Sequence, residues 1–110
     1  MLVERLDTFD FSKVSLALFS AGGSISAEFA PKAAAAGAVV VDNTSHFRRD
    51  ADIPLTVTEG NGALMGRLPE RRSSANPHCP TIEMHVALKS LHDLARIRPH
   101  EVAPYPDASG

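Results

Sequence analysis

The chain contains a single cysteine, Cys79, among its 110 residues. One thiol cannot form an intramolecular disulfide framework, so packing must hold the fold, and the thiol is expected to be reduced. The amino-terminal stretch MLVERLDTFD is polar and acidic, whereas a secretory signal begins basic and continues apolar. These features predict a cytoplasmic protein.

Long apolar runs and basic blocks are missing as well. No apolar stretch reaches the roughly 18 residues that a membrane-spanning helix needs, so no membrane partner is expected. Eleven Lys and Arg stand against thirteen Asp and Glu, for a formal net charge of −2. Without a basic cluster to follow a phosphate backbone, nucleic acid is not an expected partner. A chain of this length forms one small domain, or part of one.

The first half of the chain contains two short apolar runs with a helical segment between them. VSLALF at 14–19 ends in a turn of small residues, and AVVVD at 38–42 is β-branched, as buried strands are. The intervening residues 24–36 predict a helix capped by Ser24, with a kink or a second start at Pro31. A helix between two strands predicts a parallel, right-handed crossover and therefore an α/β fold.

The second half is less regular. IPLTV at 53–57 is a weaker strand candidate with Pro54 near its start, and ALMGRL at 63–68 predicts a short helix. After an SSANP loop, apolar residues recur at near-helical spacing and predict a helix at about 80–94, with Pro80 in its first turn. A regular central strand is excluded over the last stretch, which carries Pro99, Pro104 and Pro106.

The cysteine lies at the predicted start of that helix. Unpaired backbone N–H groups and the positive end of the helix dipole stabilise a thiolate there, which favours a nucleophile. The alternative is a small buried residue without a function, because cysteine is among the most commonly buried residue types. The local sequence leaves both interpretations of Cys79 open.

Two other features are candidates for ligand binding. The turn SAGGS at 20–24 follows a strand and precedes a helix, so its backbone suits a cofactor, although glycine in such a turn also serves simply to bend the chain. Arg48 and Arg49 follow the carboxyl end of the second predicted strand, where open α/β sheets bind ligands. A bidentate contact with an anion and a solvated, functionless pair are the two interpretations.

Imidazole and thiol groups, which are common metal ligands, recur in the second half of the chain. Two of the histidines are two turns apart on one face of the predicted helix. The spacing matches no common zinc motif, so no metal site is predicted. The residues concerned are His78, Cys79, His85 and His92.

Three motifs in order, SAGGS, DNTS-x-FR and ANP-x-C-x-TI, make the chain similar to aspartate-semialdehyde dehydrogenases. The likeness runs from about residue 6 to 97 and returns in YPDASG. It implies an NADP-dependent enzyme that interconverts aspartate semialdehyde plus phosphate with aspartyl phosphate through a cysteine thioester. That reaction belongs to lysine, methionine and threonine biosynthesis. The resemblance further implies dimers or tetramers of whole subunits.

The resemblance also assigns roles to residues. Cys79 matches the nucleophile, and Arg48 matches the arginine that holds the substrate phosphate. It implies a partial NADP-binding, Rossmann-like parallel sheet with flanking helices over 1–75, lacking the first βα unit. Residues 76–110 would carry the nucleophile loop and helix at the start of a truncated catalytic and dimerisation domain. The positions that match cofactor-lining residues are Ser20, Ala21, Gly22, Gly23, Ser24, Asn43, Thr44, Ser109 and Gly110.

Departures from the family pattern bear on activity. His78 replaces an asparagine and Pro80 a serine, which removes an N–H beside the thiolate. Pro106 stands where the substrate glutamine is expected, and the acid–base histidine falls beyond Gly110, so the chain alone is not expected to turn over. The alternatives are a non-catalytic piece that pairs with a complete homologous subunit, a homo-oligomer, or a decayed remnant.

Overall fold

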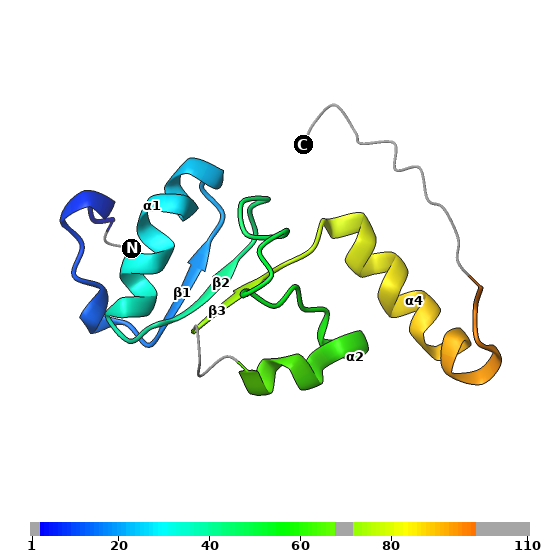
Figure 1. Cartoon of the computed structure of the whole chain (residues 1–110). Helices are drawn as coiled ribbons and strands as arrows, with labels where there is room; N and C mark the ends of the chain where they lie inside the picture. The colour runs from blue at the N-terminus through cyan, green and yellow to red at the C-terminus, as the bar shows by residue number, and fades with distance from the viewer. Residues whose placement is uncertain (1–2, 68–71, 99–110) are drawn as a thin grey trace, which may run out of the picture.

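The computed structural model describes residues 3–67 and 72–98. Three parallel strands, β1 (Leu16–Phe19), β2 (Val39–Asp42) and β3 (Ser73–Ala75), form one sheet in the order β1-β2-β3. Helix α1 (Gly23–Ala35) packs on the sheet, and α4 (Cys79–Ala95) extends away from it (Figure 1). The expectations for some residues lie outside the described ranges, namely those for Pro99, Pro104, Pro106, Ser109 and Gly110.

The predicted α/β class is confirmed, and so is the parallel pairing of the first two strands. Leu16 pairs with Val39 and Phe19 with Asp42, and α1 connects the two strands. The helix predicted at 80–94 is confirmed as α4, which contains no buried residue. Among the described residues, no helix is long and apolar enough to cross a membrane.

Helix α1 differs from the expectation at its start and at its proline. The N-cap is Gly22, whose φ of 108° suits glycine, and not Ser24, which lies inside the helix. Pro31 causes no second start, because one helix runs from Gly23 to Ala35. Both Pro31 and Ala27 are exposed, so water can bond the Ala27 carbonyl that the proline ring leaves without a donor.

The apolar core lies between α1 and the sheet. Two 3₁₀ turns, Leu6–Thr8 and Phe11–Lys13, close one end of it, and the Phe11 ring stacks on Phe19 at 6.5 Å between centroids. The opposite face of β1 is open, with Leu16 57% and Leu18 74% exposed. Helix α1 therefore covers one face of β1, and the other face of this strand is exposed. Its buried members are Phe19, Phe29, Ala30, Ala33, Ala38 and Val40.

The strand predicted over IPLTV is wrong. This segment joins the sheet at one residue only, through a bridge between Leu55 and Ala75. Pro54 has no N–H to donate. The Asn61 side chain takes the neighbouring backbone groups, since its Oδ1 accepts from the Val57 N–H at 2.8 Å and its Nδ2 donates to the Leu55 carbonyl at 2.9 Å. The Thr56 N–H and the Pro54 carbonyl bond Ala75 of β3, so Asn61 occupies the other edge of this segment.

The third strand lies where a loop was expected. Ser73, Ser74 and Ala75 are all buried and pair with Val40, Val41 and Asp42. Before it come α2 (Thr58–Asn61) and a 3₁₀ helix over Gly62–Arg67, so the short helix predicted over ALMGRL is present in 3₁₀ form as far as residue 67.

Candidate active site

The segments that follow β1, β2 and β3 meet at the carboxyl edge of the sheet. The Asn43 N–H donates to the Phe19 carbonyl at 2.8 Å. A Cβ on Gly23 would lie 3.7 Å from the His46 Cβ, so the turn after β1 borders the loop after β2. The structure therefore brings together the two segments predicted to line a cofactor, 20–24 and 43–44.

Asp42 organises this edge and was missed by the sequence analysis. Its side chain is buried, with 1% of the residue exposed, at the last position of β2. Oδ1 accepts from the Ser26 hydroxyl and the Thr44 N–H, and Oδ2 accepts from the Thr44 hydroxyl, each at 2.9 Å. A buried carboxyl group is tolerated here because both of its oxygens accept hydrogen bonds, one of them from Ser26 near the start of α1. The signal in the sequence was an acidic residue ending the apolar run AVVVD.

Arg48 is held by backbone carbonyls on two sides. Its Nε donates to the Asn76 carbonyl at 2.9 Å and its Nη2 donates to the Asn43 carbonyl at 3.0 Å. These bonds use the edge of the guanidinium formed by Nε and Nη2. Within the described chain, Nη1 has no hydrogen-bond partner, so the outer edge formed by Nη1 and Nη2 keeps N–H donors of the kind that bind an anion.

Asn76 is the second residue that sequence reasoning missed. Its N–H donates to the Asp42 carbonyl at 2.7 Å, and its Nδ2 donates to the Asn43 Oδ1 at 2.9 Å. Together with the bond from Arg48 to its carbonyl, these contacts tie the end of β3 to the end of β2. No residue type or spacing in the sequence predicts such a hydrogen bond between two loops.

Cys79 is the first residue of α4 and is exposed. Its N-cap is His78, which makes no side-chain capping bond, and Pro80 follows it within the first turn. Pro80 has no N–H, and the Thr81 N–H donates to the His78 carbonyl at 2.9 Å, so among the described contacts of the first turn only the Cys79 N–H is left for a ligand. The structure places the thiol at a helix start, as predicted, and shows it exposed rather than buried. The role of Cys79 as a nucleophile stays a prediction.

The turn after β1 offers backbone to a ligand. Ser20, Ala21, Gly22 and Ser24 are exposed, and a Cβ added to Gly22 would meet nothing within 4 Å. A dinucleotide that approaches the amino-terminal end of α1 would meet little side-chain obstruction there. The Thr44 hydroxyl and N–H are both used by Asp42, so a contact from Thr44 to a cofactor would need its other atoms.

The remaining candidates are Arg49 and the residues considered as metal ligands. Arg49 is exposed. Within residues 3–67 and 72–98, no three His, Cys, Asp or Glu side chains are grouped as a metal ion would require. His85 lies against α2 instead, because a Cβ on Gly60 would fall 1.8 Å from its Nε2.

Comparison with known proteins finds a matching family and several similar proteins. Residues 1–66 match the family described as semialdehyde dehydrogenase, NAD binding domain. Aspartate-semialdehyde dehydrogenase 2 of Vibrio cholerae serotype O1 is 51% identical over 108 residues, which are 98% of this chain and 32% of the relative. The enzyme of that name from Legionella pneumophila is 54% identical over 105 residues, or 96% of this chain and 30% of the relative.

A solved structure gives the same result. The crystal structure of aspartate semialdehyde dehydrogenase II from Vibrio cholerae, complexed with ASA, superposes with a TM-score of 0.79 at 53% identity. The superposition covers 82% of this chain and 27% of that one. The chain thus spans about a third of the length of the curated relatives it matches.

Proposed function

We propose a function from one premise: the chain belongs to the semialdehyde dehydrogenase family, through its NAD-binding domain. The proposed function is that of an aspartate-semialdehyde dehydrogenase, the NADP-dependent, reversible conversion of aspartate semialdehyde and phosphate to aspartyl phosphate. The names of the relatives support the substrate, and the match to an NAD-binding domain supports a nicotinamide dinucleotide. NADP as the particular dinucleotide is part of the proposal.

One observation carries this proposal above the others. The Arg48 Nε bonds the carbonyl of Asn76, and Cys79 follows Asn76 by three residues at the start of α4. A group suited to bind phosphate and a group suited to attack a carbonyl are thus attached to the same short segment.

Different residues of the chain are proposed to carry out different steps of the reaction. The Cys79 Sγ attacks the aldehyde carbon, so that a C–S bond forms and the carbonyl oxygen becomes a thiohemiacetal oxygen. A dinucleotide held at the turn 20–24 would accept the hydride that leaves the thiohemiacetal carbon. The hydroxyl proton is lost to solvent, and the oxidised carbon remains on Cys79 as a thioester. Phosphate on the outer edge of Arg48 then attacks the thioester carbon, the C–S bond breaks, and Cys79 leaves as the thiolate with aspartyl phosphate as the product.

The 110 residues are proposed to hold the nucleophile and the phosphate without completing turnover. His78 and Pro80 alter the surroundings of the thiol, and the relatives are about three times as long as the matched segment. The division into parts 1–75 and 76–110, the roles of the individual residues and the cytoplasmic location stay predictions.

Acylation of Cys79 by aspartyl phosphate tests the proposal without requiring a cofactor. The thiolate attacks the acyl carbon, the C–O bond to phosphate breaks, and the chain gains one aspartyl group that intact-mass spectrometry detects. We expect a single adduct on Cys79 that forms faster in buffer than in urea. Arg48→Lys should slow it about tenfold, since lysine cannot reproduce the planar fork. An adduct that persists in Cys79→Ser, or equal rates in buffer and urea, would contradict the proposal.

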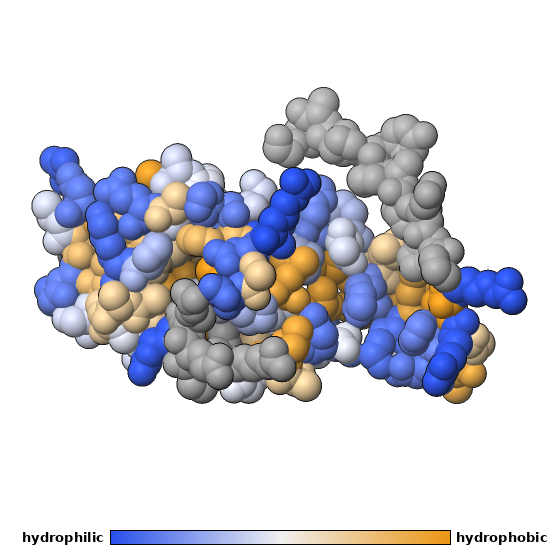
Figure 2. Space-filling view, viewed as in Figure 1, coloured by the Kyte–Doolittle hydropathy of each residue, from blue (hydrophilic) through white to orange (hydrophobic). Residues whose placement is uncertain are grey.

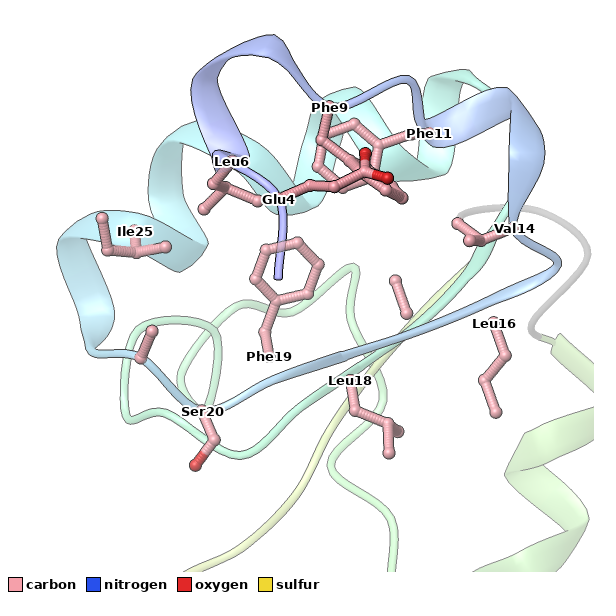
Figure 3. Close-up of a pocket in the computed structure, with 12 residues that line it drawn as sticks. Glu4, Leu6, Phe9, Phe11, Val14, Leu16, Leu18, Phe19, Ser20 and Ile25 are labelled. Carbon is pink, nitrogen blue, oxygen red and sulfur yellow. The ribbon is translucent and has the colours of Figure 1, made fainter. Parts of the chain in front are cut away.

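The open edge of the sheet favours a second candidate, a non-catalytic piece that pairs with a complete homologous subunit. Strand β1 pairs only with β2 among the described strands. Figure 3 shows Phe19 directed toward α1, with Leu16 and Leu18 on the opposite side. A pocket of about 410 Å³, lined mainly by apolar residues, lies along β1 between Leu6, Phe11 and Ser20. Apolar surface also interrupts the polar exterior in Figure 2.

An unpaired strand beside exposed leucines is the type of surface that accepts another strand. Size-exclusion chromatography with a full-length aspartate-semialdehyde dehydrogenase should then give a mixed complex. Leu18→Lys should abolish that complex, whereas Ala27→Lys, a change at an exposed position of α1, should leave it intact. Separate elution of the unmodified chain and the enzyme would remove this candidate, and elution of the chain as a dimer would support the homo-oligomer instead.

A further inference from the structure

We infer that Asn43 and Asn76 are positioning residues, whose paired side-chain amides fix the cysteine turn relative to Arg48. This inference rests on the proposed function, because it explains how the nucleophile and the phosphate arginine keep their relative positions. Neither amide needs to touch a substrate for this role.

Asn76 is attached to the loop after β2 through three separate groups. Its N–H bonds the Asp42 carbonyl, its carbonyl accepts from the Arg48 Nε, and its Nδ2 bonds the Asn43 Oδ1. Asn43 contributes twice, since its own carbonyl accepts from the Arg48 Nη2. The two asparagines and the guanidinium therefore form one closed set of hydrogen bonds.

The position of Asn76 is transmitted to the thiol by a short connection. Only Pro77 and His78 separate it from Cys79, so the two Cα atoms lie within about 11 Å of each other at full extension. Pro77 is buried and its ring restricts φ. A movement of Asn76 would therefore displace Cys79 and Arg48 together.

The amide pair is not needed to hold the fold. Asn43 is exposed and Asn76 half-buried, and a neutral hydrogen bond open to water contributes little to the stability of a fold. Burial of Asp42 with Ser26 and Thr44 already joins β2 to α1. Loss of the pair should thus affect the cysteine turn much more than the unfolding transition.

The experiment measures Cys79 alkylation by iodoacetamide in the 110-residue chain, as a function of pH and with or without inorganic phosphate. The native chain is expected to give a pH profile different from that in urea, and phosphate is expected to slow alkylation through Arg48. Asn43→Ala and Asn76→Ala should each weaken phosphate protection about fivefold and move the pH profile toward that in urea. The double variant should do no more than either single variant, because the pair acts as a unit.

Two further comparisons separate positioning from general loosening. Asn76→Asp removes the donor of the bond, whereas Asn43→Asp keeps its acceptor, so Asn76→Asp should lose more protection at equal added charge. Asn61→Ala removes the remaining asparagine, whose amide bonds Val57 and Leu55. It should leave protection unchanged.

The outcomes distinguish this inference from the proposed function. The positioning role is overturned, and the proposed function stands, if phosphate protects Cys79 equally well in the native chain and in both alanine variants. The same conclusion follows if the effects of the two substitutions multiply in the double variant. A native chain without phosphate protection, and with the same alkylation profile as in urea, overturns both. Equal loss in Asn61→Ala would show that loosening of the fold, and not the amide pair, controls the cysteine.

Discussion

The β1-α1-β2 unit and α4 are held in different ways. The first buries an apolar core that includes Phe29 and Val40, whereas α4 buries none of its residues and contacts α2. The candidate site lies at their junction, with Arg48 beside the first and Cys79 at the start of the second. Apolar burial therefore fixes the region beside Arg48, whereas the position of Cys79 depends on hydrogen bonds made by the segment 76–78.

The largest expected difference between the two regions is the loss of unfolding free energy when an apolar side chain is truncated. Phe29→Ala removes a core ring that is 9% exposed and should lower the free energy of unfolding by about 3–5 kcal/mol. Leu91→Ala on α4, at a residue 56% exposed, should change it by less than about 0.5 kcal/mol. Urea unfolding followed by circular dichroism measures both. Equal losses would show that α4 is packed as firmly as the core.

The buried carboxylate offers the next largest effect. Asp42→Ala leaves the Ser26 hydroxyl and two Thr44 donors without an acceptor, which should lower the free energy of unfolding by about 3 kcal/mol. Asp7→Ala is the matched control, because Asp7 is exposed and its carboxylate pairs with Arg5 at the surface. We expect that control to stay within about 0.5 kcal/mol of the native value. Equal unfolding curves for the two variants would refute the structural role of Asp42.

The contact between α2 and α4 tests how weakly α4 is attached. A methyl group on Gly60 would overlap the His85 imidazole, with 1.8 Å from Cβ to Nε2. Because that imidazole ends a side chain that can rotate, Gly60→Ala should destabilise by only about 1 kcal/mol. His85→Ala should relieve the loss when the two are combined in a double-mutant cycle. Additive effects would mean that the two residues do not meet in solution.

The smallest effect concerns Asp10, near the amino-terminal end of the first region. The Ser12 hydroxyl and then the Ser12 N–H donate to its carboxylate, and these bonds, with a smaller contribution from Lys13, hold the pKa of Asp10 below its usual value. The resulting stabilisation is present above the unfolded-state pKa and is lost as the pH falls through the lower folded-state pKa. Ser12→Ala should raise the pKa of Asp10 in an NMR titration of its carboxyl carbon. An unchanged titration curve would exclude the hydroxyl as the cause.

The elements that could be predicted from the sequence are those whose residues all favour one type of secondary structure. Apolar runs bounded by small residues located β1 and β2, and helical spacing located α4. Strand β3 escaped prediction because Ser73, Ser74 and Ala75 have no β-branched or aromatic side chain, and their burial arises only from neighbouring segments.

The same limit applies to the candidate site. The place of Arg48 after a strand and of Cys79 at a helix start followed from local position. The contacts of Asn76 could not, because they join residues 28 and 33 positions apart in the chain. Long-range polar contacts between loops leave no periodic pattern. The strand predicted over IPLTV failed for a local reason, since Pro54 has no N–H to donate and the segment is left with a single bridge to Ala75.

The two carbonyls that hold Arg48 have a consequence for the entropy of binding. A long side chain in solution loses rotamer freedom when it first grips a ligand, a loss of about 0.5–1.5 kcal/mol. In this chain the guanidinium plane is already fixed by Asn43 and Asn76 before any ligand arrives. Under the proposed function, an anion at the outer edge would meet a side chain that has already lost much of this freedom, so binding would cost less rotamer entropy.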